Sequence, residues 1–537
     1  MSQPFDLQGS FHVYDTTLRD GAQQEGLNLS VADKLTIARQ LDGLGVGFIE
    51  GGWPGASPKD TEFFRRASQE LDLRHARLAA FGATRRVGIR AADDPQVAAL
   101  RDSGASVVTL VAKSHDRHVE LALRTTLEEN LAMVRDTVSH LRAEGQMVFL
   151  DAEHFFDGYR DNRDYALEVL RTATEAGAEV VALCDTNGGM LPDWVSDVVT
   201  DVIASTGARV GIHAHNDSGC AVANSLAAVA AGATHVQGCI NGYGERTGNA
   251  DLVSVVANLE LKLDRRVLPT GLLREATRIA HAVAEVTNFP PASRQPYVGT
   301  SAFAHKAGLH ASAIKVDPSL YQHMDPVDVG NDMRLLVSDM AGRASIELKG
   351  RELGFDLTDS PEDRELVARV TDRVKAMEQT GYTFEAADAS FELLLIEEVE
   401  GVRPSYFDVE SWRVITETLT HAGPGEEAVS EATVKLVAED VRYVVTGEGN
   451  GPVNALDAAL RTAIGQAFPE VAKFELIDYK VRILDQGHGT DAITRVLIET
   501  SDGASSWVTV GVGHNVIEAS WGALVDGLTF GLRKHHR

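Results

Sequence analysis

The sequence is poor in cysteine and in basic residues, and it lacks any long hydrophobic run. Its 537 residues include only Cys184, Cys220 and Cys239, with no C-x-x-C pair, which argues against a disulfide framework or a thiolate zinc site. No window of about 18 uninterrupted apolar residues occurs, and the start "MSQPFDLQGS" lacks the basic and apolar segments of a signal peptide. The sequence therefore predicts no membrane partner and a cytoplasmic location.

Basic residues are outnumbered, with 50 Lys and Arg against 78 Asp and Glu, and the formal net charge is −28. Nucleic acid is a poor partner for such a chain, because binding a phosphate backbone depends on Lys and Arg. An anionic ligand would need local cations or a metal ion to overcome the unfavourable overall field.

The chain is too long for one hydrophobic core, and its first half alternates short β-rich runs with longer helical patterns, which is typical of parallel βα units. Glycines at 45, 104, 177 and 232 stand where helices should end, just before every second run. Eight units predict a (β/α)8 barrel, with a doubly wound open sheet as the alternative. The predicted strands are 12–18, 48–53, 76–81, 106–112, 146–153, 180–186, 208–215 and 235–241.

The alternation stops after about residue 285. A mostly helical region follows, and "TLTHAGPGEEAVSE" (418–431) is typical of a linker. Beyond it, "GEGNGPVNALDAAL" (447–460) and "GVGHNVIEASWGAL" (511–524) form an internal repeat, each copy following a β-rich run. We predict a barrel domain (1–285), linker subdomains (286–425) and a C-terminal α+β domain (426–537).

Polar residues of complementary types stand at the ends of the predicted barrel strands, where functional groups of such barrels gather. Since alternate residues of a strand point the same way, His213 and His215 should project together into the barrel mouth. Two imidazoles and the Asp20 carboxylate make a common divalent-metal set, suited to Zn²⁺, Mn²⁺ or Mg²⁺.

Arg19 and Glu153 stand at the ends of the first and fifth predicted strands, and they and the two histidines also have ordinary structural interpretations. The histidines could be a core residue and a surface residue, Arg19 could form an ion pair with a barrel carboxylate, and Glu153 could be a structural hydrogen-bond acceptor. The position of Arg19 beside the predicted metal ligand would also let it stabilise a developing alkoxide.

The motifs "DTTLRDGAQQEG", "HAHNDSGCAVANSLAAVAAGA" and "NGYGERTGNADL", in this order, resemble those of the isopropylmalate, homocitrate and citramalate synthase family. The resemblance covers essentially the whole chain. It implies a metal-dependent barrel acyltransferase that condenses acetyl-CoA with a 2-oxo acid. The segments "EGGWPGASPKD", "DAEHFFDGYRDN" and "LCDTNGG" are most similar to the citramalate branch, whose 2-oxo acid is pyruvate.

Carried over by motif, the resemblance implies a metal site, a catalytic set and a residue that contacts the oxo acid. The implied metal ligands are Asp20, His213 and His215, with Asn249 as a nearby or direct fourth group; the implied catalytic residues are Arg19, Glu153, His310 and Tyr321, and Thr186 contacts the oxo acid. His310 would come from the partner subunit of a homodimer. The resemblance also implies a C-terminal domain that binds a feedback amino acid, here isoleucine.

Other functions stay open at this point. Related barrels with the same arginine, aspartate and H-x-H cleave hydroxyacyl-CoA or transfer carboxyl groups, and an isopropylmalate or homocitrate synthase would take a larger 2-oxo acid. A metal-bound regulatory scaffold without catalysis is a third reading. The C-terminal domain could also serve only to hold a dimer together. Near the strand ends, Trp53, Phe81 and Phe155 could narrow the pocket to fit pyruvate, or could be ordinary packing.

Overall fold

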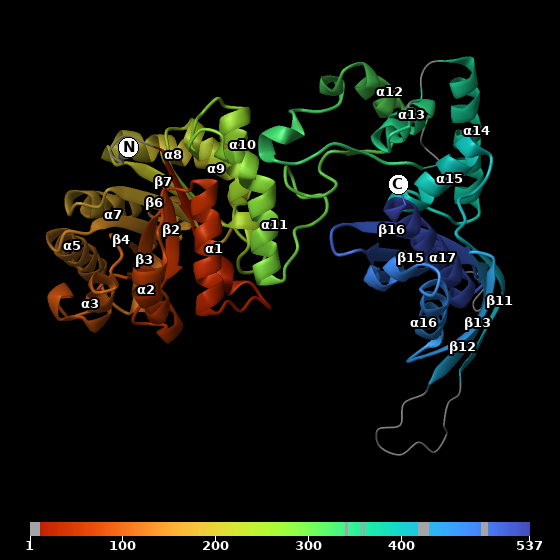
Figure 1. Ribbon diagram of the computed structural model, residues 1–537. Coiled ribbons are helices and arrows are strands. Elements are labelled where there is room, and N and C mark those ends of the chain that lie inside the picture. Colours follow the sequence, from red (N-terminus) through yellow and green to blue (C-terminus); the bar gives the residue numbers. More distant parts are fainter. Residues whose placement is uncertain are drawn as a thin grey trace. The chain divides into compact units, whose positions relative to one another are not determined.

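The computed structural model describes residues 11–338, 342–355, 357, 360–416, 429–484 and 492–536 (Figure 1). The chain divides into two compact units. The first comprises Met1–Phe303 and Met324–Asp332, and the second comprises Ala304–His323 and Met333–Arg537. The predicted boundary at residues 425/426 lies outside the described residues, and the three-domain division stays a prediction.

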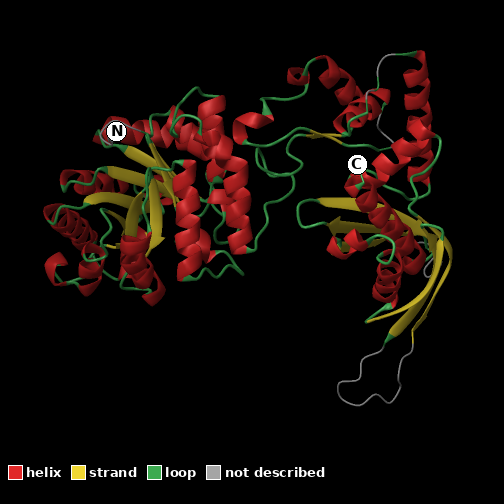
Figure 2. Ribbon diagram, in the orientation of Figure 1, coloured by secondary structure: helices red, strands yellow, loops and turns green. Residues whose placement is uncertain are grey.

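The first unit is a closed barrel of eight parallel strands, so the predicted (β/α)8 fold is confirmed and the open sheet is wrong (Figure 2). The barrel closes where β1 pairs with β8, from His12 opposite His235 to Asp15 opposite Gly238. The strands are β1 His12–Asp15, β2 Phe48–Gly52, β3 Arg77–Ala83, β4 Val107–Lys113, β5 Met147–Glu153, β6 Val180–Asp185, β7 Val210–Ala214 and β8 His235–Gly238.

Helices surround these strands, and their ends follow local sequence signals. Ser30 caps α1 by accepting a hydrogen bond from the Asp33 N–H, and the Asp33 side chain accepts one from the Ser30 N–H in return. The four predicted glycines, at 45, 104, 177 and 232, all have positive φ. The helices are α1 Val31–Leu44, α2 Pro58–Glu70, α3 Pro95–Arg101, α4 Asp116–His118, α5 Leu127–Ala143, α6 Phe155–Asp161, α7 Arg163–Glu175, α8 Pro192–Thr206, α9 Ala221–Ala230, α10 Leu252–Leu261 and α11 Ala276–Thr287.

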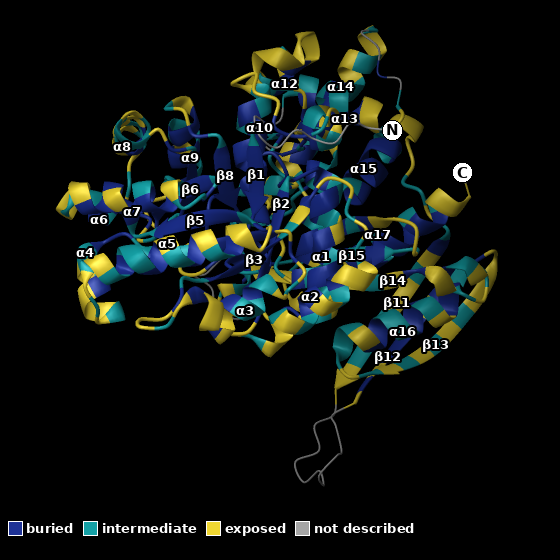
Figure 3. Ribbon diagram, turned by 90° about the vertical axis from the view of Figure 1, so that its left-hand side faces the viewer, coloured by how far each residue is buried: buried dark blue, intermediate teal, exposed yellow. Residues whose placement is uncertain are grey.

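The barrel has two apolar regions that are buried on either side of its strands. Aliphatic side chains fill the layer between strands and helices, so most strand residues are buried, whereas the helices expose their outer faces (Figure 3). Inside the barrel, Tyr14, Phe48 and Phe149 pack together, with the rings of Phe48 and Phe149 5.2 Å apart. These aromatic side chains pack the barrel interior below the polar strand ends, so the barrel has a packed core and one functional face.

The second unit begins with short segments and four helices. The strands β9 Ala304–His305 and β10 Arg334–Leu335 pair in parallel. The helices are α12 Gly308–Val316, α13 Arg343–Glu352, α14 Pro361–Gln379 and α15 Asp388–Glu400.

The internal repeat is confirmed as two copies of a three-stranded antiparallel sheet followed by a helix. At Gly447 and Gly511, an added Cβ would collide with the backbone of Ala459 and Ala519 in the following helix. These glycines therefore allow close helix-to-sheet packing, which accounts for the G-x-G of each copy. The first copy is β11 Phe407–Thr416, β12 Ser430–Ala438, β13 Val441–Gly449 and α16 Pro452–Ile464, and the second is β14 Glu475–Ile483, β15 Thr494–Ser501, β16 Ser506–Gly513 and α17 Val516–His535.

None of the helices in the described part of the chain combines the length and the apolar character needed to span a membrane.

Candidate active site

A cavity of about 820 Å³ opens at the carboxyl ends of the barrel strands. Its lining contains charged groups from both ends of the barrel sequence, together with the aromatic rings of Trp53 and Phe81. Of the residues that the sequence singled out, it contains Arg19, Asp20, Glu153, Thr186, His213 and His215. The structure therefore brings into one cavity side chains that lie almost 200 positions apart.

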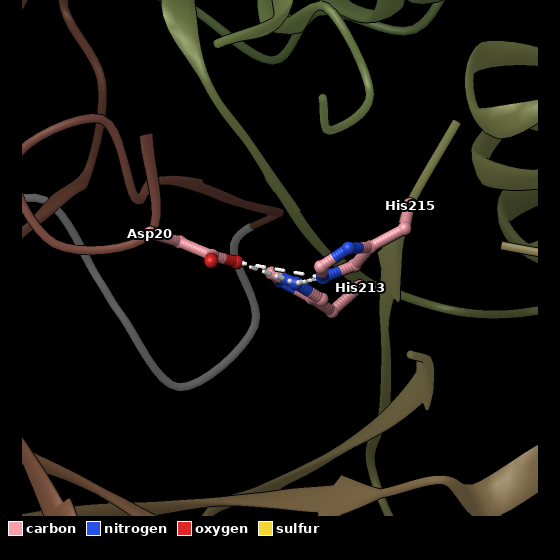
Figure 4. Close-up of side chains that lie close together, drawn as sticks. All are labelled: Asp20, His213 and His215. Carbon is pink, nitrogen blue, oxygen red and sulfur yellow. Dashed lines mark hydrogen bonds and ion pairs between the residues drawn. The ribbon is translucent and has the colours of Figure 1, made fainter. Parts of the chain in front are cut away.

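Asp20, His213 and His215 converge within this cavity (Figure 4). The Asp20 Oδ2 atom lies 3.0 Å from His213 Nε2 and 3.6 Å from His215 Nε2. One ligand atom from each residue lies within 4.8 Å of the other two, and all three residues are buried. A carboxylate and two imidazoles at this separation can hold one divalent cation.

The backbone explains how these three side chains meet. The chain turns sharply after β1, where the Thr16 carbonyl accepts hydrogen bonds from the N–H groups of Asp20 and Gly21, and this turn places Asp20 over the barrel mouth. His213 lies within β7 and His215 directly after it. The alternation of the strand then aims both imidazoles inward, as the sequence predicted.

Asn249, the predicted fourth metal ligand, lies beside His215, and its ligand role stays a prediction. It forms an isolated antiparallel bridge with His215, and its side chain is 2% exposed. Its Nδ2 atom donates to the Tyr243 carbonyl at 3.0 Å, whereas its Oδ1 atom has no hydrogen-bond partner among the described residues. A buried amide oxygen without a partner costs free energy, and a metal ion would satisfy it.

The charges around the cluster keep Asp20 ionised and His215 neutral, the forms in which both residues bind a cation. Burial alone would raise the pKa of Asp20, but the Arg19 charge and the His213 hydrogen bond hold it well below its usual range. Burial opposes a charge on His213, yet Asp20 raises the pKa of His213 above its usual value. Burial and the neighbouring His213 lower the pKa of His215 to about 4, so His215 is neutral at physiological pH. Neutral imidazole is the form that binds metals.

Arg19 lies beside this cluster and is fixed from two sides. Its Nε atom donates to Glu50 Oε2 at 2.6 Å, and its Cζ atom lies 3.9 Å from the centre of the Phe81 ring. The Tyr14 hydroxyl donates to the other Glu50 oxygen at 2.8 Å. Burial disfavours the arginine charge, but Glu50 and Asp20 raise the pKa of Arg19 above its usual range. The ion-pair interpretation and a role at the cavity are therefore compatible.

Glu153 and Thr186 line the same cavity from β5 and from the segment after β6. Glu153 pairs with Lys113, its neighbour in the β4–β5 register, and a quarter of its side chain is exposed. The Thr186 hydroxyl accepts a hydrogen bond from the His154 N–H at 2.9 Å. Both side chains are open to a ligand in the cavity, and their catalytic and binding roles stay predictions.

His310 and Tyr321 belong to the second unit, on α12 and after the 3₁₀ turn Pro318–Leu320. Their rings lie 4.2 Å apart, so the two residues form a pair. Their contribution to the barrel site remains a prediction from the family resemblance.

Sequence reasoning missed a buried polar layer beneath the cluster, formed by Glu50, Asp151 and Gln237. The signal available in the sequence was a charged or amide residue inside an otherwise apolar strand, as in "FIEGG" and "FLDAE". Burial raises the pKa of Asp151 to about 7. Of the three aromatic residues proposed to narrow the pocket, Trp53 and Phe81 line it, whereas Phe155 is fully buried among apolar side chains away from the lining.

Known families and proteins match the chain over nearly its full length. Residues 10–283 match an HMGL-like family model, residues 297–381 a homocitrate synthase post-HMGL domain-like model, and residues 385–532 a LeuA allosteric (dimerisation) domain model. A protein of Streptomyces coelicolor named (R)-citramalate synthase is 68% identical, and the alignment covers 99% of this chain and 98% of that protein. Proteins of the same name from Synechocystis and Aquifex aeolicus are each 49% identical over 98% and 97% of this chain and 96% and 98% of their own lengths.

The family predicted from the motifs is thus confirmed by both the family models and the full-length relatives. The chain belongs to the HMGL-like family and, within it, to the (R)-citramalate synthases.

Proposed function

We propose that the chain condenses acetyl-CoA with pyruvate to give (R)-citramalate and free CoA, as an acyltransferase of isoleucine biosynthesis. The observation that carries the proposal is the convergence of Arg19, Asp20, His213 and His215 in one cavity of a chain that is 68% identical over its length to a protein named (R)-citramalate synthase. The cytoplasmic location expected from the sequence is part of this proposal.

Asp20, His213, His215 and the Asn249 amide oxygen would hold a divalent cation, Mn²⁺, Zn²⁺ or Mg²⁺. Such an ion would supply a Lewis acid that polarises the ketone and helps to orient the 2-oxo acid. The Arg19 guanidinium, beside Asp20, would stabilise negative charge that develops on the ketone oxygen, and Thr186 would contact the oxo acid.

Proton transfer needs a base for the methyl group of acetyl-CoA and an acid for the new alkoxide. Glu153 faces the cavity, where it is paired with Lys113, and this position makes it a candidate base. His310 and its neighbour Tyr321 are the second candidate group, supplied by the partner subunit of a homodimer. The LeuA dimerisation domain at residues 385–532 supports the dimer.

The aromatic wall of the cavity favours a small 2-oxo acid. Trp53 and Phe81 contact each other edge to face, with ring centres 5.5 Å apart, and Arg19 lies over Phe81. This packing holds both rings in place, and we propose that these rings next to Arg19 limit the side chain of the 2-oxo acid to the methyl group of pyruvate.

The second unit would bind isoleucine as a feedback effector. It contains a cavity of about 650 Å³ between the start of α16 and β14, lined by Asp457, Arg461 and Glu475 among other residues. Carboxylates and a guanidinium in one cavity suit the ammonium and carboxylate groups of an amino acid. Isoleucine should not inhibit a chain that lacks residues 430–537. Inhibition that survives this deletion would contradict an effector site in this domain.

The test is release of free CoA thiol from acetyl-CoA with a panel of 2-oxo acids. We expect the highest kcat/KM with pyruvate and at least tenfold less with 2-oxoisovalerate or 2-oxoglutarate. Preference for a larger 2-oxo acid would make the chain an isopropylmalate or homocitrate synthase, and no thiol release with any acid would reject the synthase function.

A further inference from the structure

Two buried side chains stand behind His213, on the side of the ring away from Asp20. Gln237 pairs with His213 in the β7–β8 register, and its Oε1 atom lies 2.9 Å from His213 Nδ1. The Gln237 Nε2 atom donates in turn to Asp151 Oδ1 at 2.7 Å, across the barrel on β5. Gln237 is 1% exposed and Asp151 3% exposed, so water does not compete for these hydrogen bonds.

The chemistry of these groups sets the direction of every hydrogen bond in the row. An ionised Asp151 carboxylate only accepts, so in that state the NH₂ group of Gln237 faces Asp151 and its carbonyl oxygen faces His213. A carbonyl oxygen also only accepts, so the hydrogen of the neutral imidazole sits on Nδ1. In the neutral form of the ring, which is the form that binds a metal ion, the lone pair is then on Nε2, the atom nearest Asp20.

We propose that Asp151 and Gln237 form a positioning relay that holds His213 in the tautomer and orientation required for metal binding through Nε2. The inference rests on the metal-ligand set of the proposed function and adds two residues to it. Neither would contact the metal ion, and both would act through His213. Partners behind a ligating histidine fix its tautomer and raise its basicity, and their loss typically weakens metal binding about 10–100-fold.

The relay makes a prediction about atom types that simple packing does not make. Gln237→Met fills nearly the same volume but gives His213 no acceptor, whereas Gln237→Glu keeps an oxygen opposite Nδ1 and can share a proton with Asp151 in place of the amide hydrogen bond. We expect the Kd for Co²⁺ to rise about 10–100-fold in Q237M and to stay within about threefold of wild type in Q237E. Gln146→Met is the matched control. Gln146 lies just before β5 and is also buried, but its Nε2 atom donates hydrogen bonds to the Leu100 and Arg101 carbonyls.

Asp151 gives a second, independent pair of variants. Asp151→Asn keeps an acceptor for the Gln237 amide, whereas Asp151→Ala leaves the amide free to turn its NH₂ group toward His213. We expect D151A to weaken Co²⁺ binding and to move the ¹⁵N signals of His213 toward the Nε2–H tautomer, and D151N to keep both near wild type.

The experiment titrates the full-length, metal-stripped protein with Co²⁺ and follows the visible absorption of the bound ion, with His213→Ala defining the signal of this site. Equal affinity of Q237M and wild type, or equal losses in Q237M and Q237E, would overturn the relay. If Q237M does not fold, the D151A and D151N pair decides the question by the same criterion. If His213→Ala binds Co²⁺ as wild type does, the ligand set of the proposed function fails, which is a separate result.

Discussion

Replacing Arg19 with methionine should slow condensation and also leave a buried carboxylate in the barrel without its ion-pair partner. Methionine keeps an apolar stem over Phe81 and removes only the charge and its donors. Loss of a donor that stabilises a developing oxyanion lowers kcat by about 10²–10³-fold, equivalent to about 2.7–4 kcal/mol of transition-state free energy. Release of CoA thiol with saturating pyruvate measures this loss.

The unpaired carboxylate belongs to Glu50, whose side chain is 0% exposed, whereas that of Arg19 is 15% exposed. Removing one partner of a buried ion pair costs about 3–5 kcal/mol of stability, so R19M should unfold at lower urea concentration. The double variant Arg19→Met, Glu50→Gln removes the unpaired charge and keeps an acceptor for the Tyr14 hydroxyl. It should recover most of the lost stability and none of the lost turnover. Near-normal turnover in R19M, or recovery of turnover together with stability, would refute the assigned role.

Three further outcomes test other parts of the molecule. Stripping the protein with a chelator should abolish thiol release, and a divalent cation should restore it in wild type but not in His215→Ala; restoration in that variant would remove His215 from the ligand set. Burial raises the pKa of Asp15 to about 7, so the folded state keeps a proton that the unfolded state releases above about pH 4. The free energy of unfolding should therefore fall by up to about 4 kcal/mol as pH rises from 4 to 7. Asp15→Asn should reduce this fall. Urea midpoints of the two proteins that decrease in parallel with pH would contradict the prediction. Gly511→Ala should lower the thermal midpoint of the second unit, because the added Cβ would collide with the Ala519 carbonyl. Gly522→Ala should leave the midpoint unchanged, because the nearest atom to its Cβ would be 3.8 Å away. Equal midpoints of the two variants would show that the close packing is not required.

The barrel could be predicted from the sequence because its signals are local. A helix that ends in glycine and leads into a β-rich run needs only neighbouring residues, and Gly45 does adopt the left-handed conformation that this pattern requires, with φ of 87°. The predicted strand ends were less accurate, and the reason for this is also local. The run 12–18 extends past the last strand residue, Asp15, because Thr16 begins the turn that carries Asp20.

The ligand cluster could also be predicted, because parallel strands of a closed barrel bring their carboxyl ends to one face. The polar layer of Glu50, Asp151 and Gln237 could not, since these residues come from β2, β5 and β8 and meet only across the barrel interior. Their contacts depend on barrel closure and side-chain length rather than on spacing along the chain. His310 and Tyr321 carry no signal of their own in the sequence and entered only through the family resemblance.

The most direct measurement is the rate of CoA release from acetyl-CoA and pyruvate as metal is returned to the stripped protein in known amounts. The account predicts a rate that rises in proportion to bound metal and levels off at one ion per chain, with no rise in a variant lacking both His213 and His215. Full release by the stripped protein, or an unchanged response in that double variant, would contradict it.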